Sequence, residues 1–168
     1  MGNPYSATGR CDVEVRLAKY DDITNMVVFM KGQHAKSVYK DVPFNPVLFR
    51  KSLKNIIKGG NGDVLLAVSR AGKIRGMLMA WHESMTWTHQ KVATDIHLCA
   101  EQGGDMLLRA FRLWAQVNGC TEVCMGTFNE KDEERIEKLY NRLGLRTVGK
   151  TYRMQLNEYR ATDTRSPA

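Results

Sequence analysis

The 168-residue chain has few cysteines, few prolines and no long apolar run, and each shortage excludes a class of protein. No apolar run approaches the roughly 20 residues that a membrane-spanning helix needs, so we expect no membrane partner. The cysteines lack the close paired spacing of a zinc site, so we also expect no metal. With 4 prolines and 14 glycines, the sequence is unlike collagen or a low-complexity protein.

Acidic residues are the other shortage, and the surplus of basic residues favours an anionic partner. Lys and Arg number 25, against 18 Asp and Glu, which gives a net charge of +7 and a pI of about 9.3. Nucleic acid, a phosphorylated cofactor or an acidic protein surface fits this charge. No stretch resembles a secretory signal, so we expect a cytoplasmic protein.

The hydrophobic pattern predicts an α/β (α+β) fold. Alternating apolar residues indicate strands, and apolar residues spaced three and four apart indicate helices. Asn45-Pro46 is typical of a helix start, and Gly103-Gly104 opens another helix. The predicted strands are 13–17, 63–69, 74–82, 91–99, 122–127, 145–149 and 151–156, and the predicted helices are 23–30, 46–58, 104–117 and 130–143.

One strand–helix–strand unit, 91–127, predicts a mixed sheet. Such a unit is a crossover connection, so its two strands are expected to run parallel in a sheet that is otherwise antiparallel. The length and the 43% content of hydrophobic residues suit one domain. We place it at 13–156, between a flexible N-terminal tail at 1–12 and a polar C-terminal tail at 157–168.

Three stretches resemble the motifs of one family, in the family's order. Residues 15–22 (VRLAKYDD) are similar to its opening strand and helix cap. Residues 67–78 (AVSRAGKIRGML) are similar to its central hairpin, including a glycine early in the third strand. Residues 140–145 (YNRLGL) are similar to the Tyr-x-Lys-Leu-Gly-Phe end of its last helix. The family is the GNAT superfamily of N-acetyltransferases, and the resemblance covers about residues 13–156.

The resemblance implies a mixed central sheet of about seven strands flanked by four helices. It also implies transfer of an acetyl group from acetyl-CoA to a primary amine of a small molecule or a protein. In the family, a loop with the pattern Arg/Gln-x-x-Gly-x-Gly/Ala follows the fourth strand, and its backbone N–H groups bind the pyrophosphate of the cofactor.

This chain departs from the family in that loop. The pattern falls on 99–104, where Cys99 replaces Arg or Gln and only Gly104 fits. The carboxylates of Glu101 and Asp105 would repel a phosphate, and a tight turn without a ligand is the alternative interpretation. The cofactor residues that the resemblance implies are Leu98, Cys99, Ala100, Gln102, Gly103, Gly104, Asp105 and Asn129.

The candidate catalytic residues are Tyr140, Asp95 and His97. Tyr140 matches the family tyrosine that gives a proton to the leaving thiolate, although its place on an apolar helix face equally suits a core residue. Strand alternation predicts that Asp95 and His97 share one face, opposite Ile96 and Leu98. The two side chains would supply a general base if that face lines a cleft, and would be ordinary polar residues if it faces solvent.

Three functional hypotheses follow from these features. The first is an acetyl-CoA-dependent N-acetyltransferase. The second is a catalytically inactive GNAT-fold structural or interaction protein, for example a bacteriophage virion component, whose partners would be virion proteins or a second copy of the chain. The third is a basic nucleic-acid accessory protein, which the lack of a nucleic-acid motif disfavours.

Overall fold

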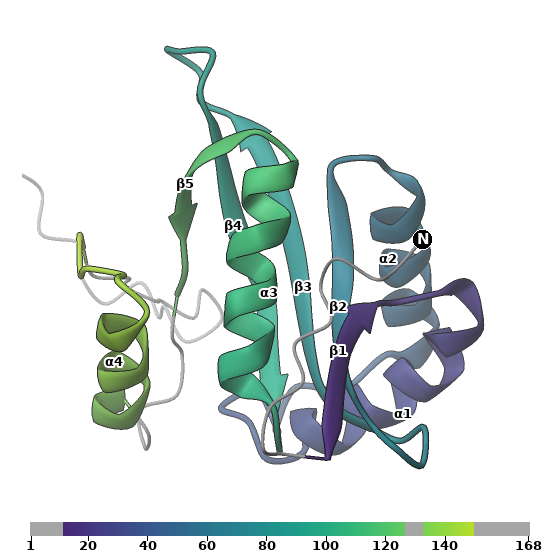
Figure 1. The fold of residues 1–168 in the computed structure, drawn as a ribbon. Coiled ribbons are helices and arrows are strands. Elements are labelled where there is room, and N and C mark those ends of the chain that lie inside the picture. Colours follow the sequence, from purple (N-terminus) through teal and green to yellow (C-terminus); the bar gives the residue numbers. More distant parts are fainter. Residues whose placement is uncertain (1–11, 127–132, 150–168) are drawn as a thin grey trace, which may run out of the picture.

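The computed structural model describes residues 12–126 and 133–149, shown in colour in Figure 1. The elements follow in the order β1 (Val13–Leu17), a 3-10 helix (Tyr20–Asp22), α1 (Ile23–His34), α2 (Pro46–Lys58), β2 (Gly62–Ser69), β3 (Ile74–Ser84), β4 (Lys91–Ala100), α3 (Gly104–Val117), β5 (Cys120–Cys124) and α4 (Glu133–Arg142). The predicted helices and the first five predicted strands are present, with ends that differ by a few residues.

The five strands form one mixed sheet in the order β1-β2-β3-β4-β5 (Figure 1). The pairs from β1 to β4 are antiparallel, and β4 pairs with β5 in parallel. The parallel pair that the crossover predicts is therefore confirmed, as is the α+β fold. The β3–β4 hairpin projects beyond the other strands, so its tip stands clear of the helices (Figure 1).

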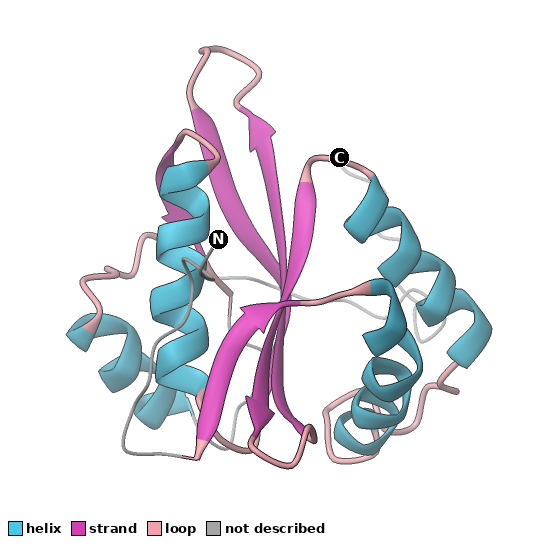
Figure 2. Cartoon of the chain, turned by 45° about the vertical axis from the view of Figure 1, so that its right-hand side comes forward, coloured by secondary structure: helices cyan, strands magenta, loops and turns pink. Residues whose placement is uncertain are grey.

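Helices cover both faces of this sheet. Figure 2 shows α1 and α2 on one side and α3 and α4 on the other. The first core contains Met26, Leu53 and Met77, and the second contains Leu78 and Phe111. Met77 and Leu78 face opposite helices because side chains alternate along a strand. Within the described ranges, no helix is long and apolar enough to cross a membrane.

Local sequence explains where α2 begins. The side-chain Oδ1 of Asn45 accepts hydrogen bonds from the backbone N–H groups of Val47 (3.1 Å) and Leu48 (3.0 Å). Pro46 follows at the first helical position, where its missing N–H costs nothing. This cap satisfies two of the donors that every helix leaves free at its start, as the sequence predicts.

The expected count of seven strands is not reached in the part of the chain that the structure describes, which holds five. Residues 145–149, predicted as a strand, form none. Val148, in this segment, is 90% exposed. The strand predicted at 151–156 lies outside the described residues. Most of the predicted N-terminal tail and all of the predicted C-terminal tail also lie outside the described residues.

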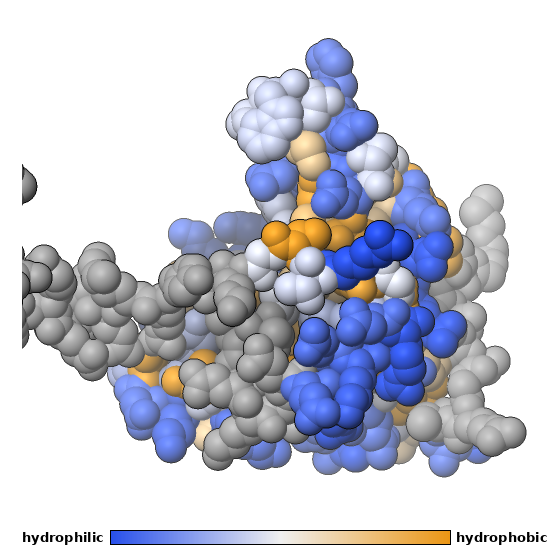
Figure 3. Space-filling view, turned by 90° about the vertical axis from the view of Figure 1, so that its left-hand side faces the viewer, coloured by the Kyte–Doolittle hydropathy of each residue, from blue (hydrophilic) through white to orange (hydrophobic). Residues whose placement is uncertain are grey.

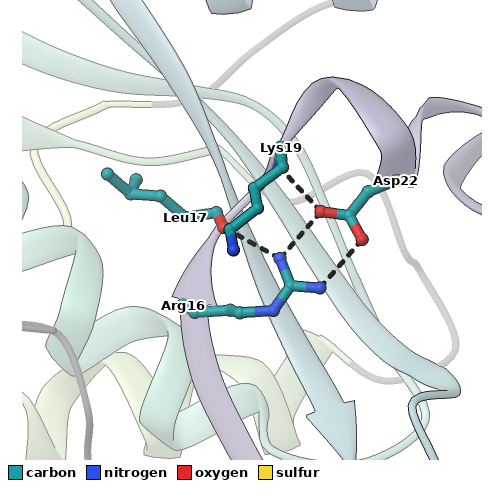
Figure 4. A network of polar contacts seen from close by, with 4 residues as sticks. All are labelled: Arg16, Leu17, Lys19 and Asp22. Carbon is teal, nitrogen blue, oxygen red and sulfur yellow. Dashed lines mark hydrogen bonds and ion pairs between the residues drawn. The ribbon is translucent and has the colours of Figure 1, made fainter.

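An ion pair joins the end of β1 to the start of α1 (Figure 4). The guanidinium of Arg16 donates to both carboxylate oxygens of Asp22, at 2.7 and 2.8 Å. The backbone N–H of Lys19 donates to the same carboxylate at 2.7 Å. These hydrogen bonds, with that of Arg16 first, lower the pKa of Asp22 below its ordinary value of 3.8. The pair fixes the turn that brings α1 back over the sheet.

We expect this pair to make stability depend on acid pH. A carboxyl group whose pKa is lower in the folded chain stabilises the fold above its unfolded pKa, and that contribution is lost as the pH falls through the folded pKa. The free energy of unfolding of the wild type should therefore fall from about pH 5 downward. In Asp22→Asn it should fall less steeply, because that variant lacks the titrating carboxyl group. At pH 7 the substitution should cost about 1.5–3 kcal/mol. Urea unfolding at several pH values measures both effects, and identical pH slopes would contradict the role of Asp22.

Candidate functional site

The parallel strands β4 and β5 separate part-way along the sheet. Their pairing runs from Lys91 opposite Cys120 to Thr94 opposite Cys124. Beyond this point β4 continues to Ala100, whereas β5 ends. Open α/β sheets bind ligands beside the carboxyl ends of their parallel strands, and β5 ends here. The candidate site therefore begins at Asp95, the residue of β4 that follows the last pair.

Asp95 is the first β4 residue past the last pair, and it connects with Tyr140 through one backbone unit. The carboxylate Oδ1 of Asp95 accepts a hydrogen bond from the N–H of Gly126 at 3.2 Å. The hydroxyl of Tyr140, on α4, donates to the carbonyl of Gly126 at 3.4 Å. The structure thus brings together a carboxylate, the chain that follows β5 and a phenol, from three elements distant in sequence.

Burial changes the acid–base behaviour of both side chains. Asp95 is largely removed from water, which raises its pKa above 3.8, although the hydrogen bond from Gly126 opposes that shift. Burial, and then the negative charge of Asp95, raises the pKa of Tyr140 to about 12. The Tyr140 hydroxyl therefore keeps its proton at neutral pH and is a weaker acid than a free tyrosine. Tyr140 is also half-buried and packs against the core under α3, so its ring has a structural contact as well.

His97 does not share a face with Asp95, so this part of the sequence prediction is wrong. Asp95 lies opposite Ala80, which belongs to the core under α3, whereas His97 lies opposite Met79, which belongs to the core under α1 and α2. The cause is a β-bulge, because Ile96 has no partner in the register. One extra residue reverses the alternation of side chains beyond it.

His97 is exposed on its face of the sheet. Partial burial lowers its pKa below the ordinary 6.5, so the imidazole is mainly neutral at pH 7. It is thus a proton acceptor that water reaches, separated by the strand from Tyr140 and Asp95.

The turn from β4 into α3 is short and tightly held. Gly103, the residue before α3, has φ +75°, and a Cβ there would lie 3.0 Å from the Cβ of Ala67 and 3.2 Å from Val13. The backbone N–H groups of Glu101 and Gln102 both donate to the carbonyl of Arg75, at 2.8 and 3.1 Å. These bonds attach the turn to the start of β3.

Figure 3 looks onto the β5 edge of the sheet and onto α4. This face is mostly hydrophilic, with a small hydrophobic area below the projecting hairpin. In the described chain, no group of three or more His, Cys, Asp and Glu side chains is placed to hold a metal ion.

The comparisons with known proteins agree with this geometry. A transcriptional regulator from Bacillus halodurans C-125 superposes with a TM-score of 0.70 at 22% identity, over 85% of this chain and 99% of that one. A GNAT family acetyltransferase from Staphylococcus aureus gives 0.59 at 18% identity, over 87% and 100%. An aminoglycoside acetyltransferase from an uncultured soil metagenomic sample gives 0.65 at 15% identity, over 87% and 99%.

The chain has the GNAT fold. No protein-family model matches it, and no curated protein matches it in sequence. The TM-scores establish the fold. Because the identities are low, the activity has to be argued from the residues.

The start of α3 fits the phosphate groups of the acetyl-CoA that GNAT acetyltransferases use. In the GNAT fold of this chain, the left-handed Gly103 leads straight into the helix, and no side chain caps it. A Cβ on Gly104 would contact only the Cβ of Ala100, at 3.5 Å, so the approach to its backbone is open. Backbone N–H groups at such a helix start bind anions.

The other cofactor residues implied by the sequence are spread over both faces of β4. Leu98 packs toward the core under α3, and Cys99 packs toward the core under α1 and α2. Ala100 is the last residue of β4, while Gln102 and Asp105 are exposed on either side of Gly103. Asn129 lies outside the described residues. The side chains of Leu98 and Cys99 thus lie toward different cores, and the exposed members of this set lie in the turn from Ala100 to Asp105.

Arg75 is the site neighbour that sequence reasoning missed. Its guanidinium Nη1 lies 3.1 Å from the carboxylate of Glu101, and its Nε lies 3.4 Å from the side-chain oxygen of Gln102. The signal was present in the expected antiparallel sheet, because antiparallel pairing of β3 with β4 places the start of β3 beside the end of β4. Gly76 is indeed opposite Ala100.

Gly103 is required both for its left-handed backbone and for the close packing around it, and comparison with Gly72 separates the two effects. Gly72, in the β2–β3 turn, has the same φ of +75° but nothing within 4 Å of a Cβ. Gly72→Ala should cost only the left-handed penalty, about 1–2 kcal/mol. Gly103→Ala should cost about 1–3 kcal/mol more, because Ala67 and Val13 must move. Urea unfolding of the two variants tests this difference, and equal losses would show that the contact at Gly103 relaxes freely.

Proposed function

We propose that this chain is an N-acetyltransferase that binds acetyl-CoA where β4 and β5 separate and acetylates a primary amine of a small molecule or a protein. The observation that carries the proposal is the cluster of Asp95, Gly126 and Tyr140 at this opening. A tyrosine that only packs needs no fixed hydroxyl, whereas a proton donor needs its hydroxyl held in one place, as the backbone of Gly126 holds that of Tyr140. The soil aminoglycoside acetyltransferase supports an amine acceptor by its fold.

Bound acetyl-CoA would supply the acetyl group as a thioester. In this proposal the start of α3, from Gly103 to Asp105, holds its phosphate groups, and the opening beside Asp95 holds its reactive end. The Tyr140 hydroxyl, whose pKa is about 12, then retains a proton for the departing thiolate.

Asp95 acts on this step as a positioning residue. Its carboxylate fixes Gly126, and Gly126 fixes the Tyr140 hydroxyl. Its negative charge also holds the phenol in the protonated form. The protein thereby preorganises the donor before the substrates arrive.

We assign removal of the amine proton to His97. Its pKa below 6.5 leaves the ring neutral and able to accept a proton at pH 7, and its side chain is exposed. The bulge at Ile96 sets His97 on the face opposite Asp95 and Tyr140. The amine would therefore approach from the face of His97 and the thioester from the face of Asp95 and Tyr140, and the two would meet where the pairing of β4 with β5 ends, so that the proton leaves the nitrogen to His97 and the departing sulfur gains one from Tyr140.

The first test is binding of acetyl-CoA measured by calorimetry, with two variants at Gly104. The wild type should bind with a dissociation constant in the micromolar range, which corresponds to a binding free energy of about −8 kcal/mol. Gly104→Ala should bind similarly, because the added Cβ meets only Ala100 at an ordinary distance. Gly104→Glu should lose binding, since it adds bulk and negative charge at the start of α3. No heat with millimolar acetyl-CoA and wild-type protein would refute the enzyme and leave a binding or structural role.

The second test is the pH dependence of turnover. In kcat/KM the wild type should lose activity below about pH 6.5 as His97 gains a proton, and His97→Gln should remove this limb along with most of the rate. Tyr140→Phe should lower turnover by about 10²–10⁴ at every pH while acetyl-CoA affinity is unchanged. Its melting temperature serves as the control, because the lost hydrogen bond is worth about 0.5–1.5 kcal/mol.

Asp95→Asn separates positioning from packing in the same experiment. Removing the negative charge should lower the pKa of Tyr140, so an alkaline loss of activity should begin at lower pH than in the wild type.

Full activity of Tyr140→Phe with a lowered melting temperature would make Tyr140 structural and its catalytic assignment wrong.

A further inference from the structure

The carboxylate of Glu101 is surrounded by groups that bind anions. Arg75 Nη1 lies 3.1 Å from its Oε2, and the amide of Gln33, on α1, donates to its Oε1 at 3.0 Å. Lys36 Nζ lies 4.0 Å from the same oxygen. Two cations and an amide donor thus converge on one carboxylate, immediately before the start of α3.

This arrangement has a surplus of positive charge. Glu101 neutralises one of the two cations, and its side chain is 35% exposed, so the carboxylate is able to turn out to solvent. The backbone of the turn would not have to follow, because the N–H groups of Glu101 and Gln102 are bound to the carbonyl of Arg75. The carboxylate occupies a position in which another anion finds the same donors.

The loop itself supplies no cation. Cys99 stands where the resemblance expects Arg or Gln, and it packs against the core under α1 and α2. The side chain of Arg75 comes from the neighbouring strand and reaches the turn from outside it. Its 27% exposure leaves part of the guanidinium open to solvent.

We propose that Arg75, with Lys36 and Gln33, binds the pyrophosphate of coenzyme A, and that Glu101 is a resident anion that the pyrophosphate displaces. This inference rests on the proposed function, since it names the side chains that hold the same cofactor. Arginine suits the task because its planar donors match phosphate oxygens in pairs.

The experiment is calorimetric titration with coenzyme A of the wild type and of three variants. Arg75→Gln should weaken binding about ten- to hundredfold, the loss expected for one charge-assisted hydrogen bond. Glu101→Gln should strengthen binding about threefold or more, because it removes a competing negative charge. Lys73→Gln is the matched control: it removes one positive charge from an exposed position in the adjacent turn, and should change affinity less than twofold.

The opposite signs distinguish binding from folding. Arg75→Gln and Glu101→Gln break the same ion pair, so a purely structural role would move their melting temperatures and affinities in the same direction. Repeating the titrations with dephospho-coenzyme A, which keeps the pyrophosphate and lacks the 3′-phosphate, should give the same ratios. If the effect of Arg75→Gln vanishes with this ligand, Arg75 contacts the 3′-phosphate and the inference is wrong.

The result also separates this inference from the proposed function. Wild-type protein that binds coenzyme A, with Arg75→Gln indistinguishable from Lys73→Gln, overturns the role of Arg75 and leaves the acetyltransferase standing. Wild-type protein that binds no coenzyme A overturns both.

Discussion

The short parallel pairing between β4 and β5 is the constraint on which the rest of the site depends. Both strands start side by side, at Lys91 and Cys120, because α3 returns the chain to the same end of the sheet. Since β5 stops at Cys124 while β4 continues, the carboxylate of Asp95 is left beside the chain that follows β5 rather than beside a strand. The contact with Gly126 then fills the role of a ladder hydrogen bond, and α4 brings Tyr140 to the same backbone unit.

Close packing around glycine sets the second half of the site. Gly103 allows the turn to press against Ala67 and Val13, and Gly76 allows β3 to lie against the turn, since a Cβ there would meet Leu107 at 2.9 Å and Gln102 at 3.0 Å. The start of α3 is thereby fixed by the core and not by a ligand. A site that is rigid before binding loses less entropy when the ligand arrives.

Local signals explain what could be predicted from the sequence. Asn45-Pro46 located the start of α2, and the apolar spacing of Ile23, Met26 and Met30 located the buried face of α1. Those features depend on residues within about two helical turns of each other. The bulge at Ile96 could not be read in the same way, because it arises from the register between β3 and β4, and a polar-apolar alternation looks unbroken through it.

Long-range contacts account for the other omissions. Arg75 and Glu101 are far apart in the sequence, and their pairing follows only from the β3–β4 register together with the sharp turn after Ala100. The strand predicted at 145–149 is wrong as well, because alternation in the sequence does not show whether a segment pairs with another strand. The sequence alone could not decide between a core role and a catalytic role for Tyr140. In the structure its ring packs against the core and its hydroxyl is hydrogen-bonded, so both roles remain compatible with its contacts.

The bulge at Ile96 also bears on how such a protein changes over evolutionary time. A regular strand would put Asp95 and His97 on one surface, where a substitution at either position alters the surroundings of the other. The bulge instead places the two side chains on opposite faces of the sheet, with the backbone of β4 between them. A substitution on the His97 face therefore leaves the hydrogen bonds of Asp95 and Tyr140 to Gly126 in place.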